Sequence, residues 1–169
     1  MRIPTRQQSF ELLWHHNIPQ NVIRHSIAVS RLAEEVAQNY IKKHPKAKIN
    51  LELLDRACLL HDISKIAAIQ KGKNEDHGEL GYELLKKHGY PEVAIIVRKH
   101  PLHCILDAKR KPKSLEEKIL FYADKRVKDN KVVTLKERLS DLRKRYPEYK
   151  AGINKSGPLV LKLEMELGQ

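Results

Sequence analysis

Apolar side chains recur at intervals of three and four residues along most of this 169-residue chain. That spacing places them on one face of an α-helix, whereas a half-buried strand would alternate apolar and polar residues. The clearest stripe follows Pro19, which suits the first turn of a helix. It comprises Val22, His25, Val29, Leu32, Val36 and Tyr40. The pattern predicts an all-α fold in which His25 lies on the buried side of a long helix.

Capping residues mark where further helices begin. Asn, Ser and Thr side chains accept hydrogen bonds from the first free amides of a helix, and a Glu three residues later completes a capping box. Such signals occur at Asn50, at Ser114 with Glu117, and at Thr134 with Glu137. They predict three helices, of which the last continues for about three turns.

Glycine and proline mark where helices end. Gly89 and Pro91 end a helix that follows the loop QKGKNEDHG at residues 70–78, and Pro101 ends the next helix. We also expect a short first helix over RQQSFELLWHH, residues 6–16. The final segment, GPLVLKLEMEL, alternates as a strand would, but its Leu, Lys, Glu and Met content favours a helix.

The composition favours a soluble protein. No apolar run approaches the roughly 20 residues that a membrane-spanning helix needs. The first residues, MRIPTRQQSFELLW, lack the apolar segment of a secretory signal. Cys58 and Cys104 form no recognisable disulfide framework, and Cys58 lies inside an apolar run, which favours a reducing compartment. We therefore expect a cytoplasmic protein with no membrane partner.

The chain is strongly basic, with 33 Lys and Arg against 21 Asp and Glu and a net charge of +12. Such a charge attracts polyanions, so nucleic acid is a possible partner. The basic clusters KKHPKAK, RKHPLHCILDAKRKPK and LRKRYPEYK are nevertheless better explained as solvated surface. Six Tyr, two Phe and one Trp leave little from which to build a base-stacking platform.

Ionisable side chains occupy inward positions on several predicted helices. His61 with Asp62 ends the apolar segment RACLLHDISK at residues 56–65, and His100 and Asp124 continue the apolar spacing of two later helices. A single buried histidine is usually a hydrogen-bonded core residue. Several ionisable groups turned inward are costly unless they satisfy one another or bind a cation, and mixed imidazole and carboxylate donors suit divalent transition metals. The pattern favours a metal site.

The order of these residues resembles the HD superfamily of metal-dependent phosphohydrolases. The resemblance covers about residues 20–130 and is carried by RHSIAVSRLAEEVA, ACLLHDISK and KILFYADK. It implies an HD-domain helical bundle, with a helical extension at residues 131–169 completing a single domain over residues 1–169. It also implies four metal ligands, which are His25, His61, Asp62 and Asp124.

Some branches of the family hold a second metal through two further histidines. His77 in DHGELG and His100 in VRKHPLH resemble those positions. His88 is a weaker choice because it precedes a glycine that stops a helix, whereas His103 could replace His100 if its helix ends early. His77 could instead be a capping residue in a polar loop.

The resemblance implies a reaction in which one or two divalent ions, such as Mn, Fe, Ni, Co, Zn or Mg, supply a metal-bound hydroxide. Asp62 would bridge the ions and Lys65 would stand near the developing phosphate charge, so both are predicted to be catalytic. A solvated lysine at a helix end is the alternative for Lys65. Lys65, Lys125 and Arg126 are predicted to contact the substrate.

These inferences predict a metal-dependent phosphohydrolase that acts on a nucleotide or another small phosphate ester or anhydride. The ligand layout looks most like the small branch that includes dinucleoside tetraphosphate hydrolases. Two alternatives stay open. One is a basic nucleic-acid-binding or regulatory protein in which the HD core only holds structure, and the other is a phosphodiesterase that cleaves nucleic acid.

Overall fold

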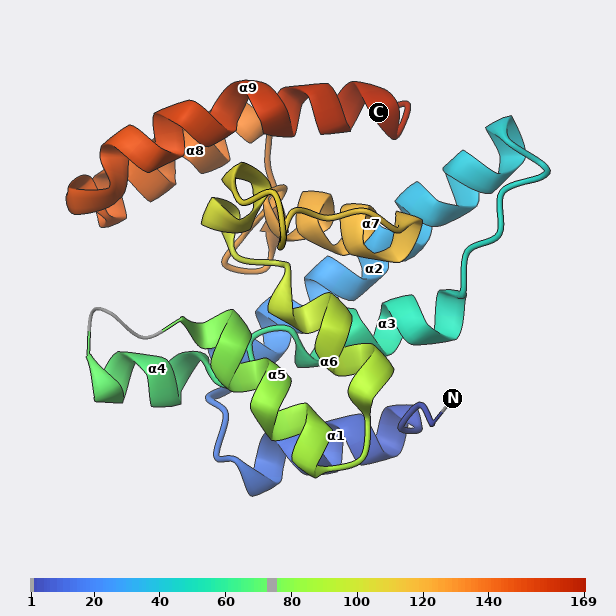
Figure 1. Cartoon of the computed structure of the whole chain (residues 1–169), viewed down its shortest axis with the longest axis vertical. Coiled ribbons are helices and arrows are strands. Elements are labelled where there is room, and N and C mark those ends of the chain that lie inside the picture. Colours follow the sequence, from blue (N-terminus) through green and yellow to red (C-terminus); the bar gives the residue numbers. More distant parts are fainter. Residues whose placement is uncertain (1, 73–75) are drawn as a thin grey trace.

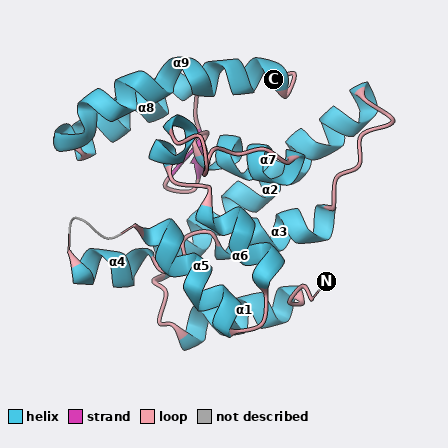
Figure 2. Ribbon diagram, in the orientation of Figure 1, coloured by secondary structure: helices cyan, strands magenta, loops and turns pink. Residues whose placement is uncertain are grey.

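A computed structural model describes residues 2–72 and 76–169 of the chain, and these residues form helices joined by short connections (Figure 1). The helices are α1 (Arg6–His15), α2 (Gln20–Lys43), α3 (Leu51–Leu60), α4 (Lys65–Lys71), α5 (His77–Lys87), α6 (Pro91–Arg98), α7 (Leu115–Asp124), α8 (Leu135–Arg145) and α9 (Lys150–Glu166). Two 3-10 turns are η1 (Leu102–Leu106) and η2 (Pro147–Tyr149). A short antiparallel hairpin consists of β1 (Val127–Lys128) and β2 (Lys131–Val132) (Figure 2). The predicted all-α class is confirmed.

The long helix α2 runs through the middle of the molecule and packs against α3 and α7. Helix α6 packs on α3 and α5 packs on α6, while α8 and α9 form a layer along the upper edge in Figure 1. The shared core includes Val29, Ala33, Val36, Leu59, Leu60, Val93, Val97, Leu120 and Phe121, all fully buried. Each larger apolar side chain contributes about 1.5–3 kcal/mol by leaving water. No helix among the described residues is long and apolar enough to span a membrane.

The capping predictions are confirmed in detail. The Asn50 side chain accepts from the Leu53 amide at the start of α3, and complete capping boxes open α7 at Ser114 and α8 at Thr134. Gly89 follows α5 with a φ of 81°, a left-handed conformation that glycine adopts without a Cβ clash. The final segment is helical, as favoured, and carries Pro158 inside α9.

Three features differ from the sequence-based expectations. Residues 65–71 form helix α4, and residues 70–71 of the expected loop belong to it, while residues 73–75 lie outside the described part of the chain. α6 ends at Arg98, so His100 lies beyond the helix on which its spacing had placed it. The residues after α7 form the hairpin, whose turn requires a φ of 55° at Asp129. Asp and Asn tolerate this conformation better than most residues, but such a turn gives only a weak local signal.

Candidate metal centre

Six ionisable side chains from five segments of the chain meet in the interior. His25 comes from α2, and His61 with Asp62 follows the end of α3. His77 is the first residue of α5, and Asp124 is the last residue of α7. His100 lies between α6 and η1. Overlapping sets of three place their ligand atoms within 4.8 Å of one another, so the structure brings together all six residues that the sequence singled out as metal ligands.

One half of the cluster is formed by His25, His61 and Asp124. The Nε2 atom of His25 lies 3.1 Å from Oδ1 of Asp124, and Nε2 of His61 lies 3.6 Å from the same oxygen. All three side chains are buried, and the His61 ring is fully so. This half, which we call the inner half, presents two imidazole nitrogens and one carboxylate oxygen to a shared point.

The other half, which we call the outer half, is formed by His77 and His100. Their Nε2 atoms lie 2.9 Å apart. Oδ1 of Asp62 lies 3.7 Å from Nε2 of His77 and 3.6 Å from Nε2 of His100. Oδ2 of the same carboxylate lies 3.5 Å from Nε2 of His61. Asp62 therefore turns one oxygen toward each half.

Backbone carbonyls hold three of the four imidazoles in a defined tautomer. Nδ1 of His25 lies 2.8 Å from the Asp129 carbonyl oxygen, that of His61 lies 2.8 Å from the Cys58 carbonyl, and that of His100 lies 2.6 Å from the Val97 carbonyl. Because a carbonyl only accepts, each Nδ1 must donate its proton, and in the neutral ring the lone pair is on Nε2. Metal-binding histidines typically donate their other ring N–H to a carbonyl or carboxylate in this way, which fixes the orientation of the ring.

The donor set fits a divalent cation. Nε2 of His61 is buried and has no hydrogen-bond partner within the described part of the chain. A buried polar atom without a partner is costly, so it calls for an explanation. A cation between the imidazole nitrogens and the carboxylate oxygens would satisfy it, and this mixture of donors suits transition metals such as Mn, Fe, Co, Ni and Zn.

The local electrostatics keep the carboxylates ionised and the outer imidazoles neutral. Burial alone would raise the pKa of Asp62, but the nearby His61 and Lys65 hold it well below its usual value. Burial opposes ionisation of Asp124 too, and Lys125 and His25 lower its pKa. Burial, together with the neighbouring His100, lowers the pKa of His77 to about 3. Ionised carboxylates and neutral imidazoles are the forms that bind metal.

Burial has a different outcome for the two fully buried histidines. It lowers the pKa of His100, and Asp62 only partly opposes this. For His61 the charges of Asp62 and Asp124 outweigh burial and raise the pKa. A cation bound at Nε2 of His61 would thus take the place of the proton that these two carboxylates favour.

The three predicted substrate-contact residues differ in position. Lys65 opens α4, and its ammonium lies 2.6 Å from Oδ2 of Asp62 while its side chain is about a third exposed. Lys125 is buried, and it donates to Asp124 and to the His100 carbonyl, the latter at 2.9 Å. Arg126 contacts the Val133 carbonyl and Glu164. Of the three, Lys65 combines contact with the cluster and access to solvent.

The histidines weighed as alternatives lie elsewhere. Nε2 of His103 lies 3.0 Å from Asp76, and half of the His103 side chain is exposed. His88 faces His16, with 3.1 Å between their Nε2 atoms. The capping residue of α5 is Asp76, whose side chain accepts from the amides of the first turn. His77 is therefore free of the capping role that the sequence left open.

The close approach of α5 to α6 brings the outer half together, and no local sequence pattern predicts it. A Cβ added at Gly78 would come within 2.8 Å of the Arg98 carbonyl oxygen and of a Pro101 ring carbon. Gly78 therefore allows the start of α5 to pack directly beside the segment that carries His100. The Ser64 hydroxyl donates to the His77 carbonyl at 2.5 Å and fixes the same turn. Both contacts depend on the tertiary fold.

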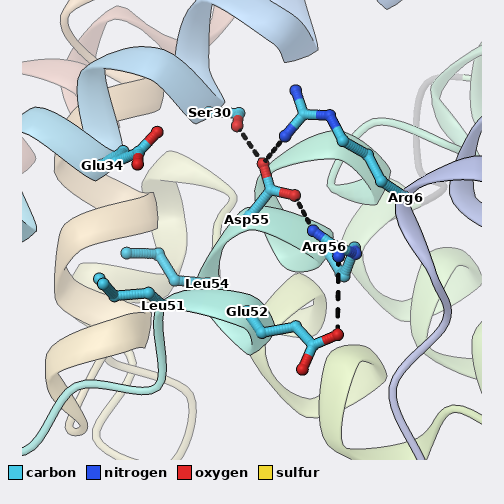
Figure 3. A pocket seen from close by; sticks show the side chains of 8 residues that line it. All are labelled: Arg6, Ser30, Glu34, Leu51, Glu52, Leu54, Asp55 and Arg56. Carbon is cyan, nitrogen blue, oxygen red and sulfur yellow. Dashed lines mark hydrogen bonds and ion pairs between the residues drawn. The ribbon is translucent and has the colours of Figure 1, made fainter.

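A separate hollow of about 240 Å³ lies between α1, α2 and α3 (Figure 3). Asp55 accepts from the Ser30 hydroxyl at 2.5 Å, pairs with Arg6 at 2.6 Å and also pairs with Arg56. None of the predicted ligands lines this hollow. Figure 3 shows the Asp55 carboxylate in contact with all three of these side chains. We therefore interpret the cluster as an ion-pair network that joins three helices.

Comparison with known proteins yields a family match and several distant relatives. An uncharacterised protein of Methanocaldococcus jannaschii is 30% identical over 137 residues, which cover 75% of this chain and 78% of that protein. A dihydroneopterin 2',3'-cyclic phosphate phosphodiesterase of the same organism is 28% identical over 144 residues, or 78% of this chain and 55% of that protein. Ribonuclease Y of Lactobacillus acidophilus is 38% identical over 86 residues, or 50% of this chain and 14% of the ribonuclease.

This chain thus spans about half of the phosphodiesterase and a small part of the ribonuclease. No solved structure gives a significant match. The family model described as the HD domain matches residues 22–128. This range runs from the start of α2 to the hairpin and contains all six residues of the cluster. The chain therefore belongs to the HD domain family.

Proposed function

We propose that this protein is a metal-dependent phosphohydrolase. The observation that carries the proposal is the position of Asp62, which turns one carboxylate oxygen toward the inner half and the other toward the outer half. One carboxylate shared by two sets of donors is suited to hold two cations. When bound, divalent ions supply a water of lowered pKa and a Lewis acid for a phosphoryl oxygen.

The protein's own groups would orient the reaction. The carboxylate of Asp62 stays ionised and contacts donors of both halves. The Lys65 ammonium lies 2.6 Å from Asp62 on a partly exposed side chain, so it can contact a phosphate oxygen and stabilise the negative charge that develops during hydrolysis. Lys125 fixes Asp124 and the His100 backbone from the protein side, and so acts as a positioning residue.

We propose a nucleotide, or another small phosphate ester or anhydride, as the substrate. The basic net charge favours phosphorylated compounds, and one relative is named as a phosphodiesterase of dihydroneopterin 2',3'-cyclic phosphate. The branch that includes dinucleoside tetraphosphate hydrolases is the narrower proposal, and it rests on the ligand layout alone.

Cleavage of nucleic acid is a second candidate. The match to ribonuclease Y, together with the net charge of +12, favours it. A non-catalytic regulatory protein is the third. It would bind nucleic acid or a partner without needing the donor set of the metal centre, so metal content and phosphate release distinguish it from both enzymes.

A substrate panel tests the proposal. Element analysis of the purified protein comes first, followed by phosphate release from mononucleotides, cyclic nucleotides, dinucleoside polyphosphates and short oligonucleotides with Mn, Fe, Co, Ni, Zn or Mg. We expect metal-dependent hydrolysis of at least one small nucleotide, and its loss in Asp62→Ala. His44→Ala, an exposed histidine outside the cluster, is the control. Turnover that persists in metal-replete Asp62→Ala would refute the mechanism.

A further inference from the structure

The hairpin and α8 enclose a second hollow, of about 510 Å³, which the metal chemistry does not use. Three lysines line it, Lys128 from β1 and Lys136 with Lys144 from α8. Ser140, Glu137 and Asp141 also line it. We call this hollow the lysine groove. Lys144 belongs to the basic cluster LRKRYPEYK, for which the composition favours solvated surface.

The acidic side chains of the lysine groove already have partners. Asp141 pairs with Lys128 at 3.3 Å, with Arg138 at 2.9 Å and with Arg145 at 3.0 Å. The Glu137 carboxylate accepts from the Thr134 amide and hydroxyl in the capping box of α8. Lys136 and Lys144 are exposed, and within the described part of the chain neither has an ion-pair partner. Among the described residues, the ammonium groups of Lys136 and Lys144 are therefore not held in ion pairs and can bind an anion.

The spacing of these lysines suits an extended polyanion. Lys136, Ser140 and Lys144 are four residues apart, so they lie on one face of α8 over about 12 Å. Two ammonium groups with a hydroxyl between them can contact successive phosphates of a strand. A mononucleotide, with its phosphates close together, would use only one end of this row.

The lysine groove is joined to the metal centre by the hairpin and by the end of α8. Asp129 in the hairpin turn directly follows Lys128, and its carbonyl accepts a hydrogen bond from Nδ1 of His25. Arg145 at the end of α8 pairs with the Asp129 carboxylate at 3.2 Å. Tyr146, the next residue, is an exposed aromatic side chain at the C-terminal end of α8, two residues after Lys144. A strand that runs from the hairpin turn along α8 would therefore meet an aromatic ring at this end of the groove.

We propose that the lysine groove binds single-stranded nucleic acid, with phosphates on Lys136 and Lys144 and a base against Tyr146, and delivers the end of the strand to the metal centre. The delivery step rests on the proposed function and narrows it, because the nucleotide at the metals then becomes the terminal unit of a strand. An exposed aromatic side chain beside a basic groove is the combination by which proteins bind single strands without sequence preference.

Charge reversal tests the groove against the general positive charge of the protein. The variant is Lys136→Glu with Lys144→Glu, and the matched control is Lys46→Glu with Lys48→Glu in the exposed connection between α2 and α3. Both change the net charge equally. Binding of a fluorescent 12-nucleotide single-stranded RNA is followed by anisotropy over a salt series, in the presence of a chelator so that no cleavage occurs.

We expect the groove variant to bind at least about tenfold more weakly at low salt, and its plot of log affinity against log salt to be flatter by about 1.4, for two lost phosphate contacts on a single strand. The control should resemble the wild type. Equal weakening in both variants would overturn the proposal, because only net charge would then matter. Unchanged RNA binding in the groove variant would overturn it as well. So would a groove variant that no longer binds vesicles of anionic phospholipid but still binds the RNA, because the groove would then be a lipid site. Circular dichroism checks that both variants fold.

The same proteins separate the two proposals. If wild-type protein binds the RNA through the groove but hydrolyses no small nucleotide and no strand end with any metal, the proposed function fails and the groove stands as a binding site only. If wild type releases phosphate from a terminally phosphorylated 12-mer, the groove variant should raise the KM for that strand at least about tenfold. An unchanged KM would overturn the delivery of the strand end.

Discussion

The inner and outer halves of the metal centre are built in different ways. The inner half takes His25 from α2 and Asp124 from α7, two helices that are far apart in the sequence and pack against each other. Its His61 ring is fully buried. The outer half takes His77 from the start of α5 and His100 from a segment beyond the end of α6. The His77 side chain is about a third exposed. Both inner-half helices and the buried His100 are held by core packing, whereas His77 stands at the partly exposed start of α5.

The difference suggests distinct roles for the two halves. We expect donors fixed by the core to keep their geometry with or without a cation, because carbonyls hold Nδ1 of His25 and His61 and both rings are buried. Donors on a turn lose their geometry more easily, and His77 has a facing imidazole, His100, as its nearest partner. We expect the inner half to bind its ion more tightly, with Asp62 coupling the two positions.

Replacement of Asp62 should have the largest effect because it removes the group that both halves share. In Asp62→Ala we expect both ions to be lost and kcat/KM to fall by about three orders of magnitude or more, since each lost 1.4 kcal/mol of transition-state stabilisation costs a factor of ten. Element analysis and steady-state kinetics measure this, with circular dichroism to check folding. Glu34→Ala, an exposed carboxylate outside the cluster, is the control. One ion retained at full occupancy would show that the halves are independent.

Replacement in the inner half should come next. His61→Ala, His25→Ala and Asp124→Ala each remove one donor of the ion that the core positions, so we expect loss of that ion and nearly complete loss of activity in a folded protein. The measurement is the metal content after dialysis at a fixed free-metal concentration. A variant of this group that kept two ions per chain would remove its residue from the ligand set.

Much of the inner half could be predicted from the sequence, because inward positions on a long helix follow from the 3.6-residue period. His25 is read from the stripe after Pro19, and His61 with Asp62 from the apolar run that precedes them. The carbonyl of Asp129, 104 residues from His25, could not be predicted. It depends on a hairpin turn with a left-handed residue and no strong local signal.

The outer half was less accessible to such reasoning. The spacing of apolar residues placed His100 on a helix, but α6 ends two residues earlier, and the residue reaches the cluster through the turn at Pro101. The family resemblance, and not periodicity, indicates His77, and its position depends on the close packing allowed by Gly78. Periodicity reports which face is buried, whereas loop geometry is set by contacts between distant segments.

Replacement in the outer half should have a smaller effect than in the inner half. In His77→Ala or His100→Ala we expect the metal count to fall from about two to one per chain, because the inner ion keeps its donors. Affinity at the outer position should fall by at least about 100-fold, the upper end of what is lost when a group that only hydrogen-bonds to a metal ligand is removed. Calorimetric titration of the metal-free protein resolves the two binding steps. A wild-type stoichiometry of one would contradict the two-ion arrangement.

The smallest effect is expected at His103, which tests where the outer half ends. His103 pairs with Asp76 rather than with the cluster, so His103→Gln should keep the metal count of the wild type. The hydrogen bond to Asp76, followed by that to Cys104, raises the pKa of His103 from 6.5 to about 9. A raised pKa means that the folded state favours the protonated ring. Its contribution to stability is therefore complete below about pH 6.5 and disappears as the pH rises through 9.

The side chain is half exposed, so the ion pair should contribute less than about 1 kcal/mol to the free energy of unfolding. Urea unfolding of metal-free wild type and His103→Gln at pH 6 should show a difference of this size, and the two curves should converge near pH 10. A difference that grew with pH would mean that the pair is not what stabilises this turn. Loss of one metal ion in His103→Gln, equal to that in His77→Ala, would place His103 in the outer half in place of His100.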